Sequence, residues 1–454
     1  MMLDIVILAA GKGTRMKSNL PKVLHPIAGK PMLGHVIDCA RQLTADTQIT
    51  LVVGHGAELV KEQYSAADVH FVEQTEQLGT GHAVQQAQDS LRDGAITLIL
   101  YGDVPLIKPS TLEELVSQVS ESSVGLLTVH LDDPNGYGRI VRDAQGNVLE
   151  IVEQMDAKPE QLQIAEGNTG VIAATSNDLK RWLPTLSNDN AQQEYYLTDV
   201  ISMAQREGKT IATQTALDEN EVLGVNNRLQ QAQLERSYQL SQAENLMIQG
   251  ATLLDPNRFD CRGTLEVGAD VVIDVNCIIE GKVTLGDGVK VGANCQIINS
   301  TVAAGTVIKP NSVIESATIG EDCDIGPFAR VRPDTVLAKG AKLGNFVETK
   351  KSVIGVGSKV NHLTYIGDAE IGDGVNVGAG TITCNYDGVN KSKTIIGDGA
   401  FIGSNSSLVA PVTIGAMATV GAGSTVSANV GDGELGVARG KQRNISNWKR
   451  PTKK

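Results

Sequence analysis

A glycine-rich loop near the start of the chain has the residue types that bind phosphate groups. The loop LAAGKGTRM (residues 8–16) follows an apolar strand, and Lys22 comes shortly after it. Its glycines Gly11 and Gly13 let backbone N–H groups approach phosphate oxygens, while Arg15 and Lys22 supply positive charge. The loop lacks the third glycine of a dinucleotide fingerprint and the GK[ST] of a P-loop. A glycine-rich turn alone is more often structural, so the two cations favour the phosphate interpretation.

Two further segments carry groups that suit a nucleotide and a metal ion. Asp103 directly follows the apolar run ITLILY, which places its carboxylate at a strand end where a divalent ion can be held against phosphates. Gln74 and the run QLGTGHA at 77–83 combine an amide with a glycine loop that opens a helix. That combination suits hydrogen bonding to the edge of a base. Each element taken alone is equally typical of a cap or a turn.

About the last two-fifths of the chain repeat an aliphatic residue every six positions. One run extends from Val267 to Ile297 and another from Ile396 to Val426, with smaller residues four positions after most aliphatic ones. Glycine often follows the aliphatic residue, where a turn needs positive φ or a close backbone approach. This period predicts a parallel β-helix of hexapeptide repeats, which buries its core between successive coils. Functional residues are therefore expected where the period breaks.

The main break surrounds His362, the one histidine of seven beyond residue 130. The steps from Leu343 to Ile354 and from Ile366 to Ile371 are each one residue short of the period. Polar side chains gather in the same stretch: Lys350, Lys351, Asn361, Tyr365 and Asn376. Histidine titrates near neutral pH and can take a proton from an attacking amine. A lone histidine is usually structural, but its polar neighbours favour a catalytic role.

Two kinds of domain are predicted to position these residues. Residues 1–226 alternate apolar β-rich runs with helical stretches such as 31–43 and 80–91, which predicts a Rossmann-like α/β domain with a mostly parallel sheet. Ligands of such sheets bind at the carboxyl ends of the strands. Residues 227–250 predict one long helix, whose moderate apolar content suits a strut between domains. The hexapeptide domain with a basic tail then covers 251–454.

The composition excludes several function classes. The net charge of −13, from 52 acidic and 39 basic side chains, argues against a nucleic-acid-binding protein. No apolar run approaches a membrane span, and the apolar start leads straight into the glycine loop, unlike a signal peptide. The six cysteines form no CxxC, and Cys277, Cys295 and Cys323 occupy the small inward position of the hexad, as core residues do. We therefore expect a cytoplasmic enzyme that acts on small molecules.

The order and spacing of LAAGKGTRM with LPK, EQLGTGHA and LYGDVPL resemble the sugar-phosphate nucleotidyltransferases. With the hexad domain behind them, the whole chain is similar to the bifunctional bacterial family of N-acetylglucosamine-1-phosphate uridylyltransferase / glucosamine-1-phosphate N-acetyltransferase enzymes. The resemblance implies a left-handed β-helix, a homotrimer formed through it, Mg²⁺ as the metal, and UTP and acetyl-CoA as co-substrates. The family feeds cell-envelope synthesis. Small-molecule substrates are the expected partners, with no nucleic acid and no membrane insertion.

The resemblance also assigns residues to two sites. Contacts with UTP and the UDP-sugar fall on Leu8, Ala9, Ala10, Gly11, Lys22, Gln74, Gly79, Thr80, Tyr101, Gly102, Asp103, Gly138, Glu153, Asn168 and Asn226. Asp103 and Asn226 would hold the metal, and Arg15 with Lys22 would stabilise the transferring phosphate. In the second half His362 is the base, and the acceptor sugar phosphate contacts Arg332, Lys350, Tyr365 and Asn376. Acetyl-CoA contacts fall on Ala379, Asn385, Tyr386, Ser404, Ala422 and Arg439.

Two alternatives stay open from the residues themselves. One is a monofunctional nucleotidyltransferase with a structural hexapeptide domain, which the residues around His362 oppose. The other is a non-catalytic assembly subunit, which the phosphate and metal residues of the first half oppose. The chain also departs from the family pattern at Asn405-Ser406-Ser407, near the CoA site. The tail from Gly440 carries six basic and no acidic residues, as either a solvated end or a contact for the CoA phosphates.

Overall fold

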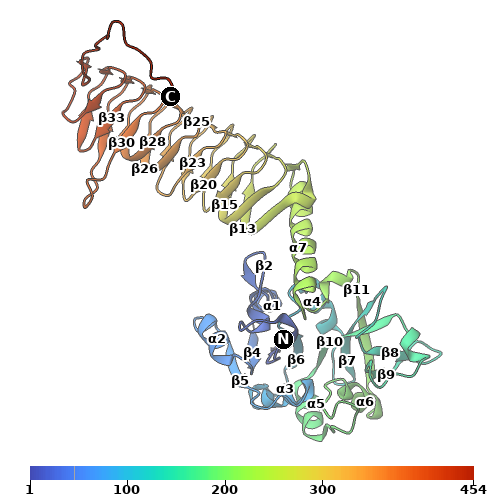
Figure 1. Ribbon diagram of the computed structural model, residues 1–454. Helices are drawn as coiled ribbons and strands as arrows, with labels where there is room; N and C mark the ends of the chain where they lie inside the picture. The colour runs from blue at the N-terminus through green and yellow to red at the C-terminus, as the bar shows by residue number, and fades with distance from the viewer. Residues whose placement is uncertain (45, 454) are drawn as a thin grey trace. The chain divides into compact units, whose positions relative to one another are not determined.

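The computed structural model describes residues 1–44 and 46–453, which form two compact units that divide between Tyr238 and Gln239. The boundary falls within one continuous helix, α7 (Arg228–Ile248), drawn in Figure 1. The prediction of a long helix in this part of the chain is confirmed. Among the described residues, no helix is both long and apolar enough to cross a membrane.

The first unit is built on a twisted, mostly parallel sheet in the order β11-β7-β10-β6-β1-β4-β5. Its strands are β1 (Leu3–Ala9), β4 (Thr47–Val53), β5 (His70–Glu73), β6 (Ile96–Tyr101), β7 (Ser123–His130), β10 (Glu166–Thr175) and β11 (Thr210–Ala216). The central strand β1 pairs in parallel with β4 and β6, whereas β10 is antiparallel to β6 and β7. A hairpin of β8 (Arg139–Arg142) and β9 (Val148–Val152) pairs with β10. The predicted Rossmann-like α/β architecture is confirmed.

Two hydrophobic cores cover the opposite faces of this sheet. Along β1, Ile5 and Ile7 belong to one core while Val6 and Leu8 belong to the other, because successive strand residues point to opposite faces. The helices of this unit are α1 (Met32–Ala40), α2 (Ala57–Gln63), α3 (Thr80–Gln86), α4 (Pro109–Ser117), α5 (Ser176–Trp182) and α6 (Asp199–Arg206). A short hairpin, β2 (Pro26–Ile27) with β3 (Lys30–Pro31), precedes α1. With both faces buried, ligand access remains at the strand ends.

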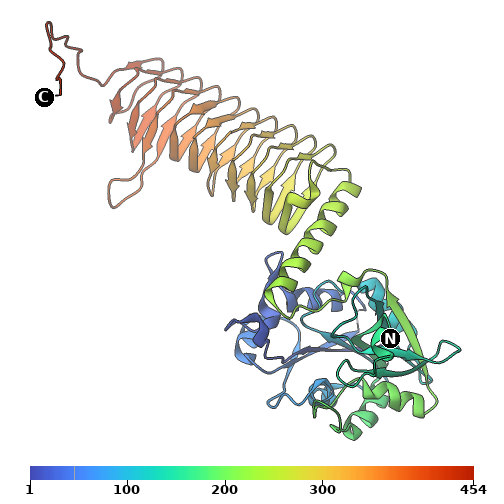
Figure 2. The ribbon, with the colours of Figure 1, turned by 45° about the vertical axis from the view of Figure 1, so that its right-hand side comes forward.

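The second unit is a left-handed parallel β-helix whose short strands stack coil upon coil (Figure 1). One sheet contains β12 (Thr252–Leu253), β14 (Val272–Ile273), β16 (Lys290–Val291), β19 (Val307–Ile308), β22 (Asp324–Ile325), β25 (Lys342–Asn345), β27 (Lys359–His362), β29 (Asn376–Val377), β32 (Phe401–Ile402), β35 (Thr419–Val420) and β37 (Leu435–Gly436). The other contains β13 (Phe259–Val267), β15 (Cys277–Leu285), β17 (Gln296–Ile298), β18 (Thr301–Val302), β20 (Val313–Glu315), β21 (Thr318–Ile319), β23 (Arg330–Val331), β24 (Val336–Leu337), β26 (Glu348–Ile354), β28 (Tyr365–Ile371), β30 (Ile382–Cys384), β31 (Thr394–Ile396), β33 (Ser407–Val409), β34 (Val412–Ile414) and β36 (Thr425–Val426). The loop between β30 and β31 projects from the stacked coils (Figure 2).

The six-residue period corresponds directly to burial. The aliphatic positions from Ile273 to Ile297 and from Ile396 to Val426 are buried. The glycines that follow them serve close approach and not positive φ: a Cβ on Gly286 would lie 2.7 Å from the backbone nitrogen of Ala304 in the next coil. The predicted core cysteines are buried and unpaired, and burial raises the pKa of the Cys277 thiol to about 12. They are core residues, as predicted.

Helix α7 connects the two units, and residues near each of its ends are buried in a different core. Leu234 is buried in a core of the first unit, whereas Ala243 and Leu246 are buried in the β-helix core. The buried Gln239 closes the first strand of the solenoid: its amide accepts from the backbone nitrogen of Cys261 at 2.7 Å and donates to the carbonyl of the same residue at 3.1 Å. A few buried apolar residues near each end of α7 are therefore enough to pack it, which explains its moderate apolar content.

Candidate active sites

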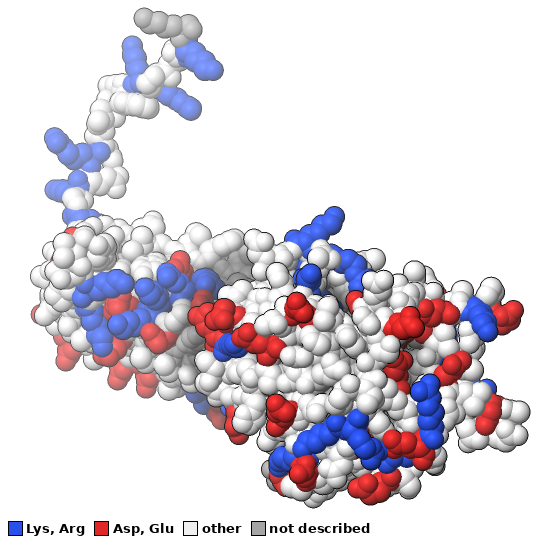
Figure 3. Space-filling model, turned by 90° about the horizontal axis from the view of Figure 1, so that it is seen from below, with Lys and Arg blue, Asp and Glu red and all other residues white. Residues whose placement is uncertain are grey.

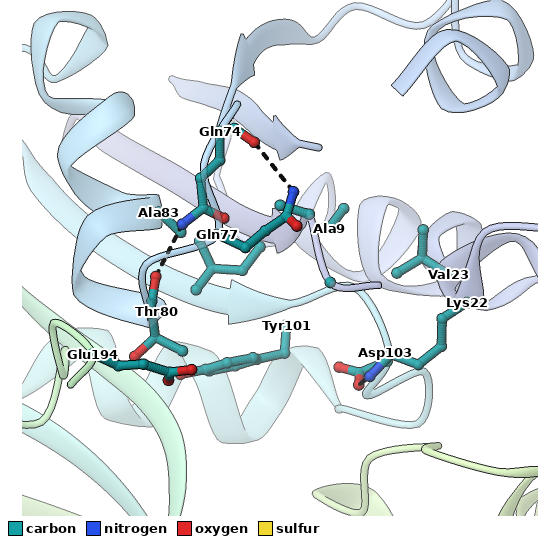
Figure 4. Close-up of a pocket in the computed structure, with 14 residues that line it drawn as sticks. Ala9, Lys22, Val23, Gln74, Gln77, Thr80, Ala83, Tyr101, Asp103 and Glu194 are labelled. Carbon is teal, nitrogen blue, oxygen red and sulfur yellow. Dashed lines mark hydrogen bonds and ion pairs between the residues drawn. The ribbon is translucent and has the colours of Figure 1, made fainter. Parts of the chain in front are cut away.

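A cavity of about 230 Å³ opens where β1, β5 and β6 end in the first unit (Figure 4). The predicted nucleotide residues that line it are Leu8, Ala9, Ala10, Gly11, Lys22, Gln74, Gly79, Thr80, Tyr101 and Asp103. Val23, Gln77, Ala83 and Glu194 line it as well and were not predicted. Gln77 lies in a motif that the sequence singled out, whereas Glu194 had no signal in the sequence. Four segments far apart in the chain thus form one cavity.

One end of the cavity is a cluster of cations and oxygen ligands. The Lys22 ammonium forms an ion pair with Asp103 and lies 3.3 Å from the amide oxygen of Asn226. The Arg15 guanidinium donates to the same oxygen at 3.0 Å. The side chains of Lys22 and Asp103 are largely buried, so solvent screens their attraction only weakly. The predicted residues Arg15, Lys22, Asp103 and Asn226 are therefore brought together.

The oxygens of Asp103 and Asn226 meet a simple test for a metal site. A single ammonium nitrogen contacts both, so they face one common cation position. Mg²⁺ is usually held by one or two carboxylates together with substrate phosphates and water. Among the described residues there is no cluster of three or more His, Cys, Asp or Glu side chains that could form a cage of protein ligands alone. One carboxylate and one amide oxygen beside a phosphate loop fit Mg²⁺.

The opposite end of the cavity carries polar groups suited to a base. The buried Gln74 donates through its amide nitrogen to the carbonyl of Gly79 at 3.0 Å and lies 3.1 Å from Nδ1 of His82. These contacts fix the amide and leave its carbonyl oxygen to accept from a base N–H. Gly79 has φ 112°, and a Cβ there would lie 2.6 Å from the carbonyl oxygen of Tyr195. Only glycine fits this turn before α3, which explains the GTG segment.

The predicted sugar contacts form a neighbouring cluster. Gly138 accepts from the backbone nitrogen of Asn168 at 2.8 Å, and a Cβ on Gly138 would lie 3.4 Å from the Glu153 carboxylate. Burial raises the pKa of Glu153, although Thr198 donates to it at 3.4 Å. This cluster adjoins the cavity through Tyr101, whose pKa is raised mainly by burial and further by the nearby negative charges of Glu153 and Asp103.

Gly102 has a packing role beside the same cavity. Its backbone nitrogen donates to the carbonyl of Leu8 at 2.9 Å. A Cβ on Gly102 would lie 3.2 Å from the side chains of Leu33 and Val23. The hydrogen bond of Gly102 thus ties the end of β6 to β1. The small size of Gly102 lets the backbone that leads to Asp103 pass close to Leu33 and Val23.

In the β-helix, His362 is exposed at the end of β27 and contacts the preceding coil. Its Nδ1 lies 3.1 Å from Oδ1 of Asn345, its register partner in β25. Because an amide oxygen can only accept, this contact favours, in the neutral ring, the tautomer with its hydrogen on Nδ1 and a lone pair on Nε2. Asn345 was not predicted, although it precedes His362 by 17 residues, about one coil. The arrangement leaves Nε2 free to accept a proton.

Three cations gather near β26. The pKa of Lys350 is lowered, chiefly by Lys391 and also by Arg332, because like charges disfavour its protonated form. Arg332 donates to Glu348 at 2.6 Å. Lys391 lies in the projecting loop and was not predicted. Cations that repel one another are typical of a site that binds a multiply charged anion such as a phosphate monoester.

The other acceptor residues lie on the two sheets of the same coils. Lys350 is the register partner of Gly367, and a Cβ on Gly367 would clash with the hydroxyl of Tyr365. Tyr365 therefore extends over the strand next to Lys350. Asn376 pairs with Lys359 and so lies on the sheet that carries His362.

Four of the predicted acetyl-CoA residues form a column at one corner of the solenoid. The carbonyl of Ala379 accepts from the backbone nitrogen of Asn405 at 2.7 Å, one coil later. The carbonyl of Ser404 accepts from Gly423, and that of Ala422 accepts from the guanidinium of Arg439 at 2.5 Å. The column therefore runs through Ala379, Ser404, Ala422 and Arg439.

The remaining two acetyl-CoA residues lie in the projecting loop. Asn385 donates to Asp368 at 2.5 Å, and the Tyr386 hydroxyl donates to the carbonyl of Gly388 at 2.5 Å. A cavity of about 310 Å³ lies beneath this loop, lined in part by Asp368 and Lys391. Within the described part of the chain, no hydrogen bond or ion pair joins Asn385 or Tyr386 to the column.

The departure at residues 405–407 has a local explanation. Asn405 has φ 54°, a left-handed conformation that asparagine tolerates better than most residues. Ser406 is buried and donates to the carbonyl of Gly403 at 2.6 Å.

The basic tail is exposed throughout residues 440–453, and Lys and Arg side chains project along it (Figure 3). Lys454, the last of its predicted basic residues, lies outside the described residues.

Comparison with known proteins agrees with both folds. A MobA-like NTP transferase domain matches residues 5–178, a GMPPB C-terminal domain matches 261–345, and six repeats of the bacterial transferase hexapeptide match 393–428. The chain is 65% identical to the bifunctional protein GlmU of Saccharophagus degradans and 63% identical to that of Cellvibrio japonicus, each over all of both chains. It is 59% identical to that of Marinobacter nauticus over 99% of both. The chain belongs to the family of bifunctional GlmU proteins.

Proposed function

We propose that the chain catalyses two successive transfers that make UDP-N-acetylglucosamine. The β-helix unit transfers an acetyl group from acetyl-CoA to glucosamine-1-phosphate. The first unit then transfers UMP from UTP to the resulting N-acetylglucosamine-1-phosphate and releases pyrophosphate. The observation that carries the proposal is full-length identity to bifunctional relatives together with two separate clusters of the required chemistry.

The uridylyl transfer follows from the cavity of the first unit. A phosphate oxygen of the sugar phosphate attacks the α-phosphorus of UTP in line, and the bond to the pyrophosphate oxygen breaks. Lys22 and Arg15 neutralise the charge that spreads over the transferring group. Gln74 and the Gly79 turn hold the uracil, while Glu153 and Asn168 hold the sugar. No covalent enzyme intermediate is needed, so positioning and charge supply the catalysis.

The metal and its ligands complete this site. Mg²⁺ would be held by Asp103 and Asn226 and would neutralise phosphate charge when bound. Lys22 contacts both of these oxygens, so its ammonium stays close enough to the metal position to reach the same phosphates. Arg15 donates to the same oxygen of Asn226 and so helps to fix its side chain.

The acetyl transfer follows from the residues around His362. The amine nitrogen of glucosamine-1-phosphate attacks the thioester carbonyl carbon, and Nε2 of His362 takes a proton from that nitrogen. The carbon–sulfur bond then breaks, and the CoA sulfur takes up this proton from Nε2 and leaves as a thiol. Lys350, Arg332 and Lys391 bind the phosphate of the acceptor, and Tyr365 with Asn376 contact its sugar. General-base help of this kind is worth about 10² to 10⁴-fold.

We further propose that the acetyl site is completed in a homotrimer formed through the β-helix. The two groups of acetyl-CoA residues are not joined within one chain, and the stacked rings of Phe328 and Phe346 are exposed on the coils. Exposed aromatic pairs are typical of protein interfaces. The six cysteines, all of which the structure describes, are free, and this agrees with a cytoplasmic location.

A paired assay tests the function. Purified protein is given glucosamine-1-phosphate, acetyl-CoA, UTP and Mg²⁺ while free thiol and pyrophosphate are followed. Both products are expected, and His362→Ala should abolish thiol release while added N-acetylglucosamine-1-phosphate still yields pyrophosphate. Wild-type protein that releases pyrophosphate but no thiol would instead support the monofunctional alternative.

A further inference from the structure

Three polar side chains of α7 contact the segment that follows Lys22, at His25, Pro26 and Ala28. Arg228, Gln231 and Glu235 are spaced three and four apart, which places them on one side of the helix. The three contacts described next lie within the first unit, which extends to Tyr238.

Each contact is at hydrogen-bond distance. The Arg228 guanidinium lies 3.0 Å from Nδ1 of His25, and the amide nitrogen of Gln231 donates to the carbonyl of Pro26 at 2.8 Å. The Glu235 carboxylate accepts from the backbone nitrogen of Ala28 at 2.6 Å. Two of these interactions hold the backbone of the β2–β3 hairpin, and the third holds the ring of His25 just before it.

The hairpin conformation requires this support. Ala28 has φ 50°, a left-handed conformation that costs a non-glycine residue free energy unless its surroundings hold it there. A carboxylate that accepts from the Ala28 N–H is a charge-assisted hydrogen bond, roughly twice as strong as a neutral one. Below these contacts, Ile27 packs in the same core as Leu234 of α7.

The segment that these three side chains hold follows Lys22 directly in the chain. The backbone nitrogen of His25 donates to the carbonyl of Lys22 at 3.2 Å, closing a single 3₁₀ turn, Lys22–Leu24. The Lys22 side chain is long and flexible, so the position of its ammonium depends on where its backbone is anchored. On one side that anchor is the hairpin, and on the other its ammonium meets Asp103.

We propose that Arg228, Gln231 and Glu235 are positioning residues for uridylyl transfer, which aim Lys22 at the transferring phosphate by fixing the hairpin against α7. The proposal rests on the proposed function of the cavity. Because Lys22 contributes mainly when charge develops at the phosphorus, loosening its anchor reduces kcat more than it raises the KM for either substrate.

The test compares Glu235→Ala with Glu235→Gln, whose amide oxygen still accepts from Ala28. We expect Glu235→Ala to lower the kcat of pyrophosphate release about tenfold, with the KM for N-acetylglucosamine-1-phosphate within about twofold, and Glu235→Gln to keep most of the rate. Gln231→Leu should lower kcat in the same direction. Gln233→Leu, exposed on the same helix, is the matched control and should change nothing.

Thiol release by the same preparations separates positioning from general loss of folding. It should be unchanged in every variant, since the β-helix carries that site. The proposal is overturned if Glu235→Ala keeps its kcat, if Glu235→Gln is as slow as Glu235→Ala, or if thiol release falls in parallel. If Glu235→Ala fails to fold, Gln231→Leu alone decides, because it keeps the carboxylate. Absence of pyrophosphate release from wild-type protein would instead refute the proposed function.

Discussion

Replacing Asn345 with alanine tests whether this amide prepares His362 as the base. The change removes the oxygen that accepts from Nδ1 and so no longer selects the tautomer with a free Nε2. A hydrogen bond of this kind between neutral, solvent-accessible groups contributes about 0.5 to 1.5 kcal/mol, which corresponds to roughly 2- to 10-fold in rate. Removing His362 itself should cost about 10² to 10⁴-fold.

A double-mutant cycle isolates the pairing. The kcat/KM for thiol release is measured with glucosamine-1-phosphate for wild type, Asn345→Ala, His362→Ala and the double variant, with pyrophosphate release as the control for folding. Because Asn345 is expected to act only through His362, the double variant should be no slower than His362→Ala. Multiplicative losses, or an Asn345→Ala rate equal to wild type, would refute the reasoning.

Three further variants test the sites and the fold. Asp103→Asn should lower pyrophosphate release by about 10²-fold or more, because Lys22 and the metal lose their shared carboxylate, while thiol release stays unchanged. Glu153→Gln should melt at a higher temperature than wild type near about pH 8 and at the same temperature near about pH 4. Burial raises the pKa of Glu153, so the native state binds more protons than the unfolded state and wild-type stability falls as pH rises through that range; equal melting temperatures at both pH values would contradict this. Gln239→Leu leaves the buried backbone N–H and C=O of Cys261 without their partner and should destabilise the β-helix by about 2 to 4 kcal/mol, measured as the urea midpoint of thiol-releasing activity, with pyrophosphate release retained.

The sequence by itself determined the features that arise from local periodicity and chain direction. A six-residue repeat admits one kind of coil, so burial at Ile273 and Ile402 follows from spacing alone. Alternating strands and helices likewise imply a sheet with ligands at its strand ends. For that reason the position of the glycine loop, Lys22 and Asp103 at one edge of the sheet follows from the order of the strands and loops.

Only the tertiary structure decided which side chains meet across long separations. Asn226 reaches Lys22 from 204 residues away, and Lys391 reaches Lys350 through a loop whose path the repeat does not specify. Asn345 meets His362 because the coils stack in register, which places residues 17 apart in the chain side by side. The roles of Glu235 and Gln239 were hidden for the same reason, since a helix pattern shows which face is polar but not what that face contacts. Contacts of this kind depend on packing geometry, and a one-dimensional pattern does not contain it.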